Sequence, residues 1–237
     1  MESFDLKCEV KESEWEYIEE IEYCYAQNVN ITSRNQEITS VNGRTEPTSL
    51  EGLWINFQTA HYLPTGIDKF FPNLLGLDVQ GSKLKSVTQD DLKPLTQLEY
   101  VSFWKNDLES LDGDLFKFNS KLQYVAFFNN KLNYVGENLL SNLKDLKECV
   151  FNFNPCISAH AHRSSQIPEL VDIIKTECSL SVLISKNVQL KRENVFLKNQ
   201  TNQQRIELNS KIILLKTENE NYKRLLKICD GNLNAVC

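Results

Sequence analysis

Residues 98–108 read LEYVSFWKNDL, and residues 122–132 read LQYVAFFNNKL. Both stretches place Leu at positions 1 and 11, Val at position 4, Phe at position 6 and Asn at position 9. The same 24-residue spacing extends outward in both directions, and the five segments that share it begin at Leu50, Leu74, Leu98, Leu122 and Leu146. A fixed period of this length indicates a chain built from repeated structural units that stack on one another.

Three rows of side chains run through these units. The two inner apolar rows are Leu53, Leu77, Val101, Val125 and Cys149 at position 4, and Ile55, Val79, Phe103, Phe127 and Phe151 at position 6. The polar row at position 9 is Gln58, Ser82, Asn106, Asn130 and Asn154. These are the slots L-x-x-L-x-L-x-x-N-x-L of a leucine-rich repeat. We therefore predict an α/β solenoid over 50–154, in which each unit adds one strand to a parallel sheet on the concave face.

The segment before Leu50 extends the same pattern in a weaker form. Val29 and Ile31 fit the two inner slots one period earlier, with Ala26 at the start of the unit. We therefore expect residues 1–49 to form an N-terminal cap and a degenerate first repeat.

Four cysteines lie where a solenoid needs covering at its two ends. Cys8 and Cys24 flank an aromatic segment that contains Trp15, Tyr17 and Tyr23, and Cys156 and Cys178 bound a segment with helical apolar spacing after Pro168. We predict disulfides Cys8–Cys24 and Cys156–Cys178, the second closing a C-terminal cap over 155–178. Cys149 occupies an inner slot and is expected to be a buried free thiol.

Residues 179–228 lack glycine and proline and are predicted to form a coiled-coil helix, followed by a Cys-containing tail at 229–237. Leucines seven residues apart alternate with asparagines, and a four-residue stutter near residue 204 shifts the pattern. The predicted seam is Leu183, Asn187, Leu190, Asn194, Leu197, Leu208, Ile212, Leu215, Tyr222 and Leu226. We expect a homodimer or heterodimer through this seam, with Cys229 or Cys237 as candidates for an interchain disulfide, unless the two pair within one chain. A helix packed on its own repeats is the alternative.

The candidate ligand site lies on the concave face. Strand side chains alternate between the two faces of a sheet, so positions 3, 5 and 7 point away from the core. The predicted binding residues are Trp54, Asp78, Gln80, Tyr100, Trp104, Lys105, Tyr124, Phe128 and Asn129. Outward aromatics in register are typical anchors of protein interfaces, although they can also be cross-strand pairs or lie under the N-terminal cap.

Signals for catalysis are thin. None of the three histidines, His61, His160 and His162, has a chain spacing to a cysteine or carboxylate that defines a triad or zinc site. We expect no enzyme activity, metal or cofactor, and we interpret His160 and His162 as an exposed loop pair. Asn30 and Asn199 begin N-x-T triplets and are candidate glycosylation sites if the chain is secreted.

The composition of the chain argues against two classes of binding partner, nucleic acids and membranes. The 237 residues carry a formal net charge of −6, which argues against a nucleic acid as the partner. The sequence contains no run of 18 apolar residues, so we expect no insertion into a membrane. The cysteine pattern favours an extracellular, secreted protein, although the first twenty residues lack the apolar core of a signal peptide. A cytoplasmic protein with reduced thiols is the alternative.

Together the 24-residue units at 98–108 and 122–132, the cysteine-bounded caps and the cysteine-bearing coiled coil resemble secreted insect leucine-rich repeat proteins, in particular the mosquito immune proteins of this class. The resemblance implies disulfide-linked dimers in haemolymph that bind complement-like proteins or pathogen surfaces in innate immunity. The expected function is therefore extracellular recognition of a protein ligand. An intracellular scaffold, whose repeats hold one partner while the helix recruits another, is the alternative.

Overall fold

The computed structural model describes residues 2–231, and of residues 221 and 224–231 it describes the backbone alone. The chain divides into two compact units, Met1–Leu183 and Ile184–Cys237. The first holds all the strands of the described residues, and the second is helical.

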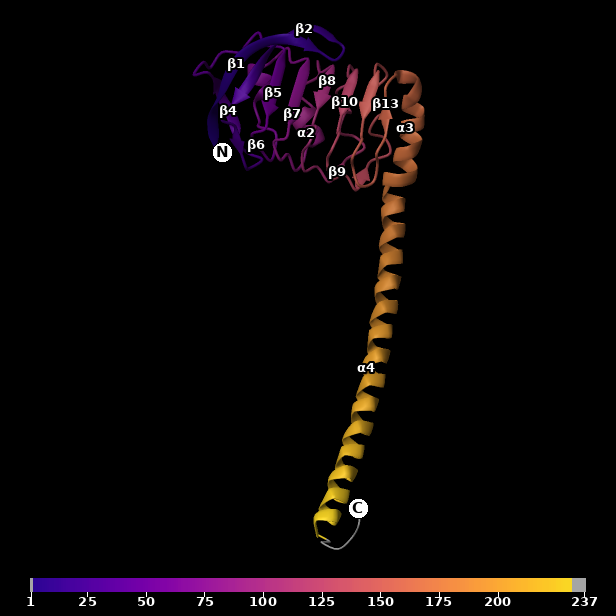
Figure 1. Cartoon of the computed structure of the whole chain (residues 1–237). Helices are drawn as coiled ribbons and strands as arrows, with labels where there is room; N and C mark the ends of the chain where they lie inside the picture. The colour runs from indigo at the N-terminus through magenta and orange to yellow at the C-terminus, as the bar shows by residue number, and fades with distance from the viewer. Residues whose placement is uncertain (1, 232–237) are drawn as a thin grey trace. The chain divides into compact units, whose positions relative to one another are not determined.

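The first unit is built on a parallel-rich β-sheet (Figure 1). Nine strands among the described residues pair in the order β13-β12-β10-β8-β7-β5-β2-β1-β4. Their bounds are β1 Ser3–Trp15, β2 Ile18–Gln27, β4 Glu37–Val41, β5 Gly52–Asn56, β7 Gly76–Gln80, β8 Tyr100–Ser102, β10 Tyr124–Ala126, β12 Glu148–Val150 and β13 His160–Ala161. Neighbouring strands in the run β2, β5, β7, β8, β10 and β12 are parallel to one another. At the two ends of this run, β1 is antiparallel to β2 and β13 is antiparallel to β12.

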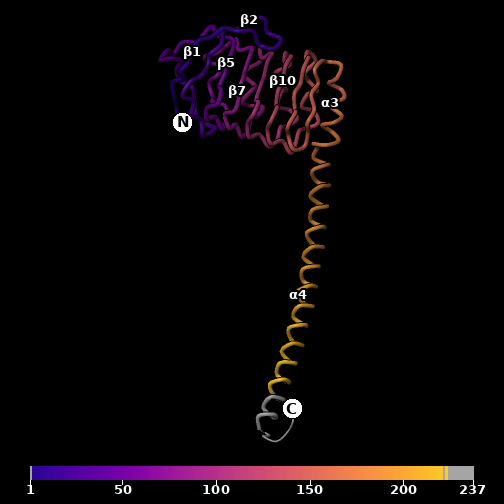
Figure 2. Tube along the Cα trace, in the orientation of Figure 1, coloured from indigo at the N-terminus to yellow at the C-terminus, as the bar shows by residue number. Residues whose placement is uncertain are grey.

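Neighbouring parallel strands from β5 to β12 pair at a constant sequence offset. Gly52 pairs with Gly76, Gly76 with Tyr100, Tyr100 with Tyr124, and Tyr124 with Glu148. Each step equals the period of the sequence rows, so every member of a row lies beside the next member on the adjacent strand. The predicted parallel strands are confirmed. Figure 2 shows the successive turns of the backbone from β5 to β10 lying side by side.

The core lies under one face of the sheet. All ten residues of the two inner apolar rows are fully buried, including Phe103, Phe127 and Phe151. The ring of Phe127 lies 5.8 Å from that of Phe103 and 5.4 Å from that of Phe151, measured between centroids. Cys149 is buried among them as a free thiol, as predicted.

The position 9 row closes the turn after each strand. Asn130 Oδ1 accepts a hydrogen bond from Leu108 N at 3.1 Å, and its Nδ2 donates to Phe103 O at 2.8 Å and Phe127 O at 3.1 Å. The residue before each member of this row has a positive φ angle; these are Phe57, Gly81, Lys105, Asn129 and Phe153. The backbone therefore makes the same left-handed turn after each of five strands, which leaves carbonyl and amide groups for the Asn side chains to satisfy.

The first parallel strand differs from its prediction. Val29 and Ile31 were expected in the inner slots, but Cys24 and Ala26 of β2 pair with Leu53 and Ile55 of β5. Ile31 instead pairs with Ala60, in a separate two-stranded sheet of β3 (Asn30–Ile31) and β6 (Thr59–Ala60). In both the β2–β5 and the β3–β6 pairing, the partners are separated by the same number of residues in the sequence, and this number exceeds the 24-residue period. The turn from β2 to β3 therefore has its usual length, and the extra residues follow Ile31, in the segment that contains β4. This longer first unit explains why the simple extension of the period fails there.

Both ends of the sheet carry a disulfide. The bonds are Cys8–Cys24, between β1 and β2, and Cys156–Cys178, around the C-terminal segment; they are the two pairs that the sequence predicts. The C-terminal segment holds a 3-10 helix Ser164–Gln166, α3 Ile167–Ile173 and a π-helical turn Ile174–Cys178. The remaining short elements are α1 Ile67–Phe70, α2 Gln89–Leu92, β9 Ser110–Leu111 and β11 Tyr134–Val135.

The second unit consists of the long helix α4, Leu180–Gly231, apart from its first turn, which belongs to the first unit. The predicted long C-terminal helix is confirmed. Absence of glycine and proline between Leu180 and Ile228 explains why it continues without a break. Within the described residues, no helix combines the length and apolar character needed to cross a membrane.

Candidate functional site: the open face of the sheet

The open face is the sheet surface opposite the core, and it carries the residues predicted to bind a ligand. Alternation along each strand places Trp54, Asp78, Tyr100 and Tyr124 on this face. The rings of Tyr100 and Tyr124 stack at 4.7 Å with an interplanar angle of 7°. The parallel register therefore brings together aromatic side chains that lie one full repeat apart in the sequence.

The tip of the β1–β2 hairpin covers one part of the open face. Trp15 lies 5.1 Å from Tyr100 between ring centroids, and Tyr23 lies 5.7 Å from Trp54. Gly76 makes room for this contact, because a Cβ atom there would lie 2.5 Å from Trp15 Cζ3. Trp54 and Tyr100 were expected to be open to a ligand; both are half-buried and pack against the hairpin residues Ile18 and Ile21, and Tyr100 also lines the groove described below.

A second group of aromatics is left outside the hairpin. We call Trp104, Phe128 and Phe153 the aromatic ladder. Its rings meet edge to face, with centroids 5.8 Å apart for Trp104 and Phe128 and 5.1 Å apart for Phe128 and Phe153. Phe153 is 67% exposed. The expected pair of Trp104 and Phe128 is therefore side by side, and the ladder extends one unit further than predicted.

The ladder borders an open groove of about 350 Å³. The groove runs across the sheet and is lined by Gln80, Tyr100, Ser102, Trp104, Tyr124, Ala126, Phe128, Glu148, Val150, Asn152 and His160. Lys105 and Asn129, the predicted flanking residues, lie at the left-handed turns, and Lys105 Nζ lies 5.2 Å from the ring of Phe57. Apolar rings with polar groups between them are the usual lining of a recognition surface.

Asp78 is the buried carboxylate of the open face, with 5% of its surface exposed. Its Oδ2 accepts hydrogen bonds from Gln80 Nε2 at 2.7 Å and from Tyr100 Oη at 3.4 Å. Burial raises the pKa of Asp78 to about 7, although hydrogen bonds from Gln80, Ser102 and Tyr100 act in the opposite direction. The carboxyl therefore binds a proton much more readily than an exposed aspartate does.

Several buried polar atoms on or beside the open face make no hydrogen bond with the described residues. They are Trp54 Nε1, Asn56 Oδ1, Asp78 Oδ1 and Trp104 Nε1. Buried polar groups are hydrogen-bonded in more than about nine cases of ten, so a cluster of four is unusual. Of these, Trp104 Nε1 belongs to a ring that also lines the groove.

The sequence did not predict two contacts of Glu148, at the end of the groove that Glu148 and His160 line. Tyr17, at the hairpin tip, donates a hydrogen bond to Glu148 Oε2 at 2.9 Å, and His160 Nε2 lies 2.7 Å from Glu148 Oε1. The interpretation of His160 as an exposed loop residue without a carboxylate partner is wrong. It belongs to β13, an antiparallel strand whose pairing with β12 cannot be read from the sequence spacing.

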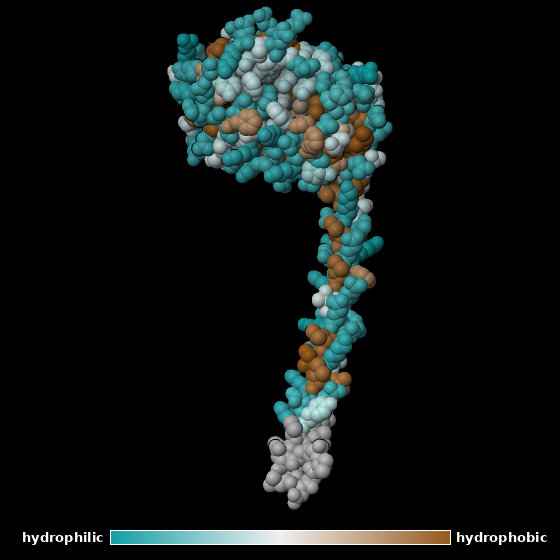
Figure 3. Space-filling model, viewed as in Figure 1, coloured by the Kyte–Doolittle hydropathy of each residue, from teal (hydrophilic) through white to brown (hydrophobic). Residues whose placement is uncertain are grey.

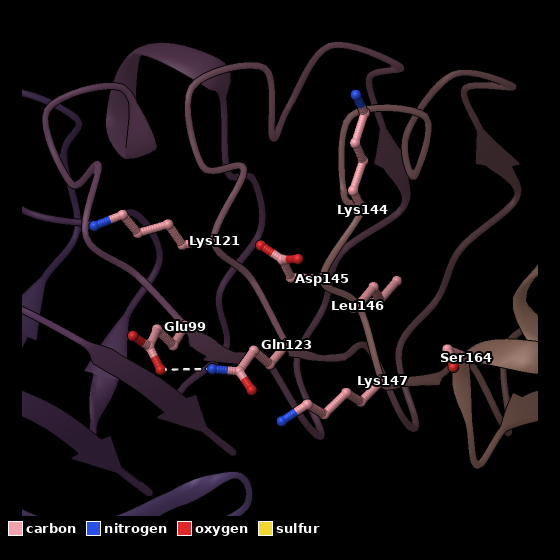
Figure 4. A pocket seen from close by; sticks show the side chains of 8 residues that line it. All are labelled: Glu99, Lys121, Gln123, Lys144, Asp145, Leu146, Lys147 and Ser164. Carbon is pink, nitrogen blue, oxygen red and sulfur yellow. Dashed lines mark hydrogen bonds between the residues drawn. The ribbon is translucent and has the colours of Figure 1, made fainter.

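A larger pocket of about 650 Å³ lies among the segments that precede the strands (Figure 4). Its lining is mostly charged, and Gln123 Nε2 donates to Glu99 Oε2 at 2.6 Å. The side chains of Lys121, Lys144 and Lys147 point in different directions and converge on no common point. This arrangement suits a hydrated surface better than a binding site.

The predicted seam of α4 is exposed where side chains are described. Leu190, Leu197, Leu208, Ile212, Leu215 and Tyr222 are exposed, as are Asn187 and Asn194, and Leu183 is half-buried. Apolar residues recur along the helix among polar ones (Figure 3). The side chains of Leu226 and Cys229 and the whole of Cys237 lie outside the described residues. The predicted glycosylation residues Asn30 and Asn199 are both exposed.

Comparisons with known proteins do not identify a family for this chain. No family model matches the chain, and no curated protein matches it. A solved structure of the Toll–Spatzle complex from Drosophila is similar, with 21% sequence identity and a TM-score of 0.44. The match covers 52% of this chain and 17% of that chain. The function therefore has to be argued from this chain's own residues.

Proposed function

We propose that the chain is a non-enzymatic recognition protein: a leucine-rich repeat solenoid that binds a protein ligand on its open face, which is the concave one. The repeat assignment is supported by a constant pairing offset equal to the sequence period, the Asn row and the recurring left-handed turn. In this proposal 1–49 is the N-terminal cap, 50–154 the repeats and 155–178 the C-terminal cap. The coiled coil at 179–228 and the tail at 229–237 complete it.

The aromatic ladder is the observation that carries the proposal. Trp104 and Phe128 line the groove, and Phe153 packs edge to face against Phe128 on the next unit. Exposed Phe153 fills no core, and the Trp104 indole N–H has no partner among the described residues. Large aromatic side chains with one free polar group are the residues that most often dominate protein interfaces.

The second part of the proposal is a parallel dimer of two copies of this chain through α4. A helix of this length with exposed leucines is not stable alone in water, since its apolar side chains need a partner surface. Asn187 and Asn194 occupy a positions between the leucines, and paired Asn residues at such positions favour parallel, in-register dimers. A heterodimer with a related chain is the other outcome of the test given below.

The third part concerns location. Two disulfides in the described part of the chain are compatible with an oxidising, extracellular compartment. The resemblance of the sequence to secreted insect immune proteins adds innate immunity as the proposed setting. Two heads on one dimer would raise the avidity for a ligand displayed in several copies.

The binding face is tested with Trp104→Ala/Phe128→Ala. Proteins captured by the wild-type chain from extracellular fluid of its native source are identified, purified and titrated against both forms. We expect at least a tenfold rise in the dissociation constant, because truncating central aromatics removes about 2 kcal/mol or more of binding free energy.

The matched control is Phe118→Ala, an aromatic that is 38% exposed and lies near Lys93 and Lys117, away from the groove lining. It should bind like the wild type. A purified ligand that binds the double variant as tightly as the wild type, while both unfold at the same denaturant concentration, would overturn the assignment of this face.

A further inference from the structure

Glu148, His160 and His162 lie on one side of the last two strands of the sheet. β13 runs antiparallel to β12, with Val150 opposite His160 and Cys149 opposite Ala161. The same register places Glu148 opposite His162. Residues two apart on a strand share a face, and directly opposed residues do so as well. Backbone pairing therefore brings two imidazoles and one carboxylate together, although a long turn separates the histidines from Glu148 in the sequence.

The side chains are close enough to share one ion. One nitrogen of each histidine and one oxygen of Glu148 all lie within 4.8 Å of one another. His160 Nε2 is 2.7 Å from Glu148 Oε1, and the two imidazole centroids are 3.5 Å apart. Around a tetrahedral Zn²⁺ with bonds of about 2.0 to 2.1 Å, ligand atoms stand roughly 3.4 Å apart.

We infer that Glu148, His160 and His162 form a Zn²⁺ site at the end of the groove. Two imidazoles and one carboxylate are a donor set that zinc uses in proteins when it keeps a fourth position for water or another ligand. His162 is exposed, so the ion has access from solvent. Glu148 and His160 also line the groove, which places the fourth position beside the proposed ligand surface.

Neighbouring groups hold the three ligands in place. The Tyr17 hydroxyl donates to Glu148 Oε2 and leaves Oε1 for the ion, and Gln166 Oε1 accepts a hydrogen bond from His162 N at 3.0 Å. A hydrogen bond to a ligating carboxylate, such as the one from Tyr17 to Glu148, orients the metal ligand and raises affinity. A simple ion pair with Glu148 accounts for one histidine only. The ring of His162 contacts that of His160 at 3.5 Å between centroids, which adds a second imidazole nitrogen beside the Glu148 carboxylate.

The test measures Zn²⁺ binding to the full chain with its disulfides intact, by competition with a chromogenic chelator. We expect one Zn²⁺ per chain for this site, and at least a tenfold weaker affinity in His162→Ala and in Glu148→Gln. His162→Ala removes an exposed side chain and should fold normally. Co²⁺ substitution should give the visible absorption of a four-coordinate ion in the wild type and lose it in both variants.

Two controls separate this site from other zinc ligands in the chain. His61→Ala removes the histidine of the first repeat and should bind Zn²⁺ like the wild type. Cys229→Ser/Cys237→Ser removes the C-terminal thiols and should also leave binding unchanged. No uptake of Zn²⁺ by the wild type, or uptake that survives in His162→Ala and Glu148→Gln but disappears in the cysteine variant, would overturn the inference.

Discussion

The two units of this chain differ in the burial of their apolar side chains, which are packed in a core in the sheet unit and exposed in the helix unit. In the sheet unit Phe127 is 0% exposed between the rings of its neighbours, whereas Phe196 of α4 is 62% exposed. Both are phenylalanines in continuous, regular structure. The sheet unit buries its apolar rows by stacking successive segments of one chain, but a single helix has no second layer within its own unit.

This contrast separates two sources of stability. The sheet unit closes both ends of its core with its own segments, β1 with β4 at one end and β13 with α3 at the other, and each end has a disulfide. In the proposed dimer the helix unit would bury its seam against a second chain, so its stability should vary with protein concentration. The following predictions exploit that difference.

The largest expected effect is on the sheet core. Phe127→Ala should lower the free energy of unfolding of the sheet unit by about 3 to 5 kcal/mol, because it removes a fully buried ring and leaves a cavity between Phe103 and Phe151. Denaturant unfolding followed by tryptophan fluorescence measures this, since Trp15, Trp54 and Trp104 all lie in the sheet unit.

The same truncation in the helix is the matched control. Phe196→Ala should change the tryptophan-detected transition by less than about 0.5 kcal/mol, as expected for an exposed side chain. Equal destabilisation by the two substitutions would mean that the units do not differ in the way described.

The next effect concerns the helix seam. Leu190→Glu/Leu197→Glu should weaken the α4 dimer at least 100-fold, or about 2.7 kcal/mol, because it places like charges in a buried seam. Sedimentation equilibrium under reducing conditions measures this independently of any bond through Cys229 or Cys237. Gln203→Glu, which adds one charge away from the predicted seam, should leave the dimer unchanged.

Non-reducing and reducing gels of the native protein extend this test to the compartment. A dimer that separates only on reduction would support an interchain disulfide. A wild-type chain that is monomeric at all concentrations contradicts the dimer, and seven titratable thiols in the native protein would favour the intracellular scaffold.

The smallest effect is electrostatic and belongs to the sheet unit. Asp78→Asn should raise the free energy of unfolding by about 2 kcal/mol at pH 8. The pKa shift from 3.8 to about 7 corresponds to a cost of about 4 kcal/mol for ionising the buried carboxyl, and the Asn amide, buried in the same place, retains about half of that cost as its own desolvation. The folded pKa lies above the unfolded value of 3.8, so the stability contributed by proton binding is present at low pH. It is lost as pH rises through about 7.

The measurement is the difference in unfolding free energy between variant and wild type at several pH values. It should grow between pH 4 and pH 7 and stay constant above that range. Subtracting the unfolding free energy of the wild type removes the opposite pH dependence of other groups. One of these is Asp5, whose pKa is lowered to about 2, mainly by its hydrogen bond with the Lys7 side chain. A difference independent of pH would show that Asp78 does not titrate in this range.

The sequence predicts the strands where the 24-residue period is intact, because each row position dictates burial by itself. Leu77 and Val101 needed only their slot to be placed correctly. The first strand could not be placed in this way. Cys24 and Ala26 take the inner slots because extra residues after Ile31 lengthen the first unit, and no periodic signal reports such an insertion.

The candidate site was predictable only in its periodic half. Trp104 and Phe128 follow from alternation and register, and Phe153 could have been found by extending position 8 of the repeat to its last member. The hairpin over Tyr100 and the contact of His160 with Glu148 could not. Both depend on how a non-repeating segment folds back onto the sheet, which no pattern within that segment encodes.

The hydrogen bond from Tyr17 to Glu148 joins the hairpin at the start of the chain to the last parallel strand of the sheet. In the proposed solenoid each unit contacts only its neighbours, so the stack could bend. A hairpin attached at both ends of the stack would limit that bending. The proposed ligand would then meet a sheet that is already held in one shape and would lose little affinity to straightening or closing motions.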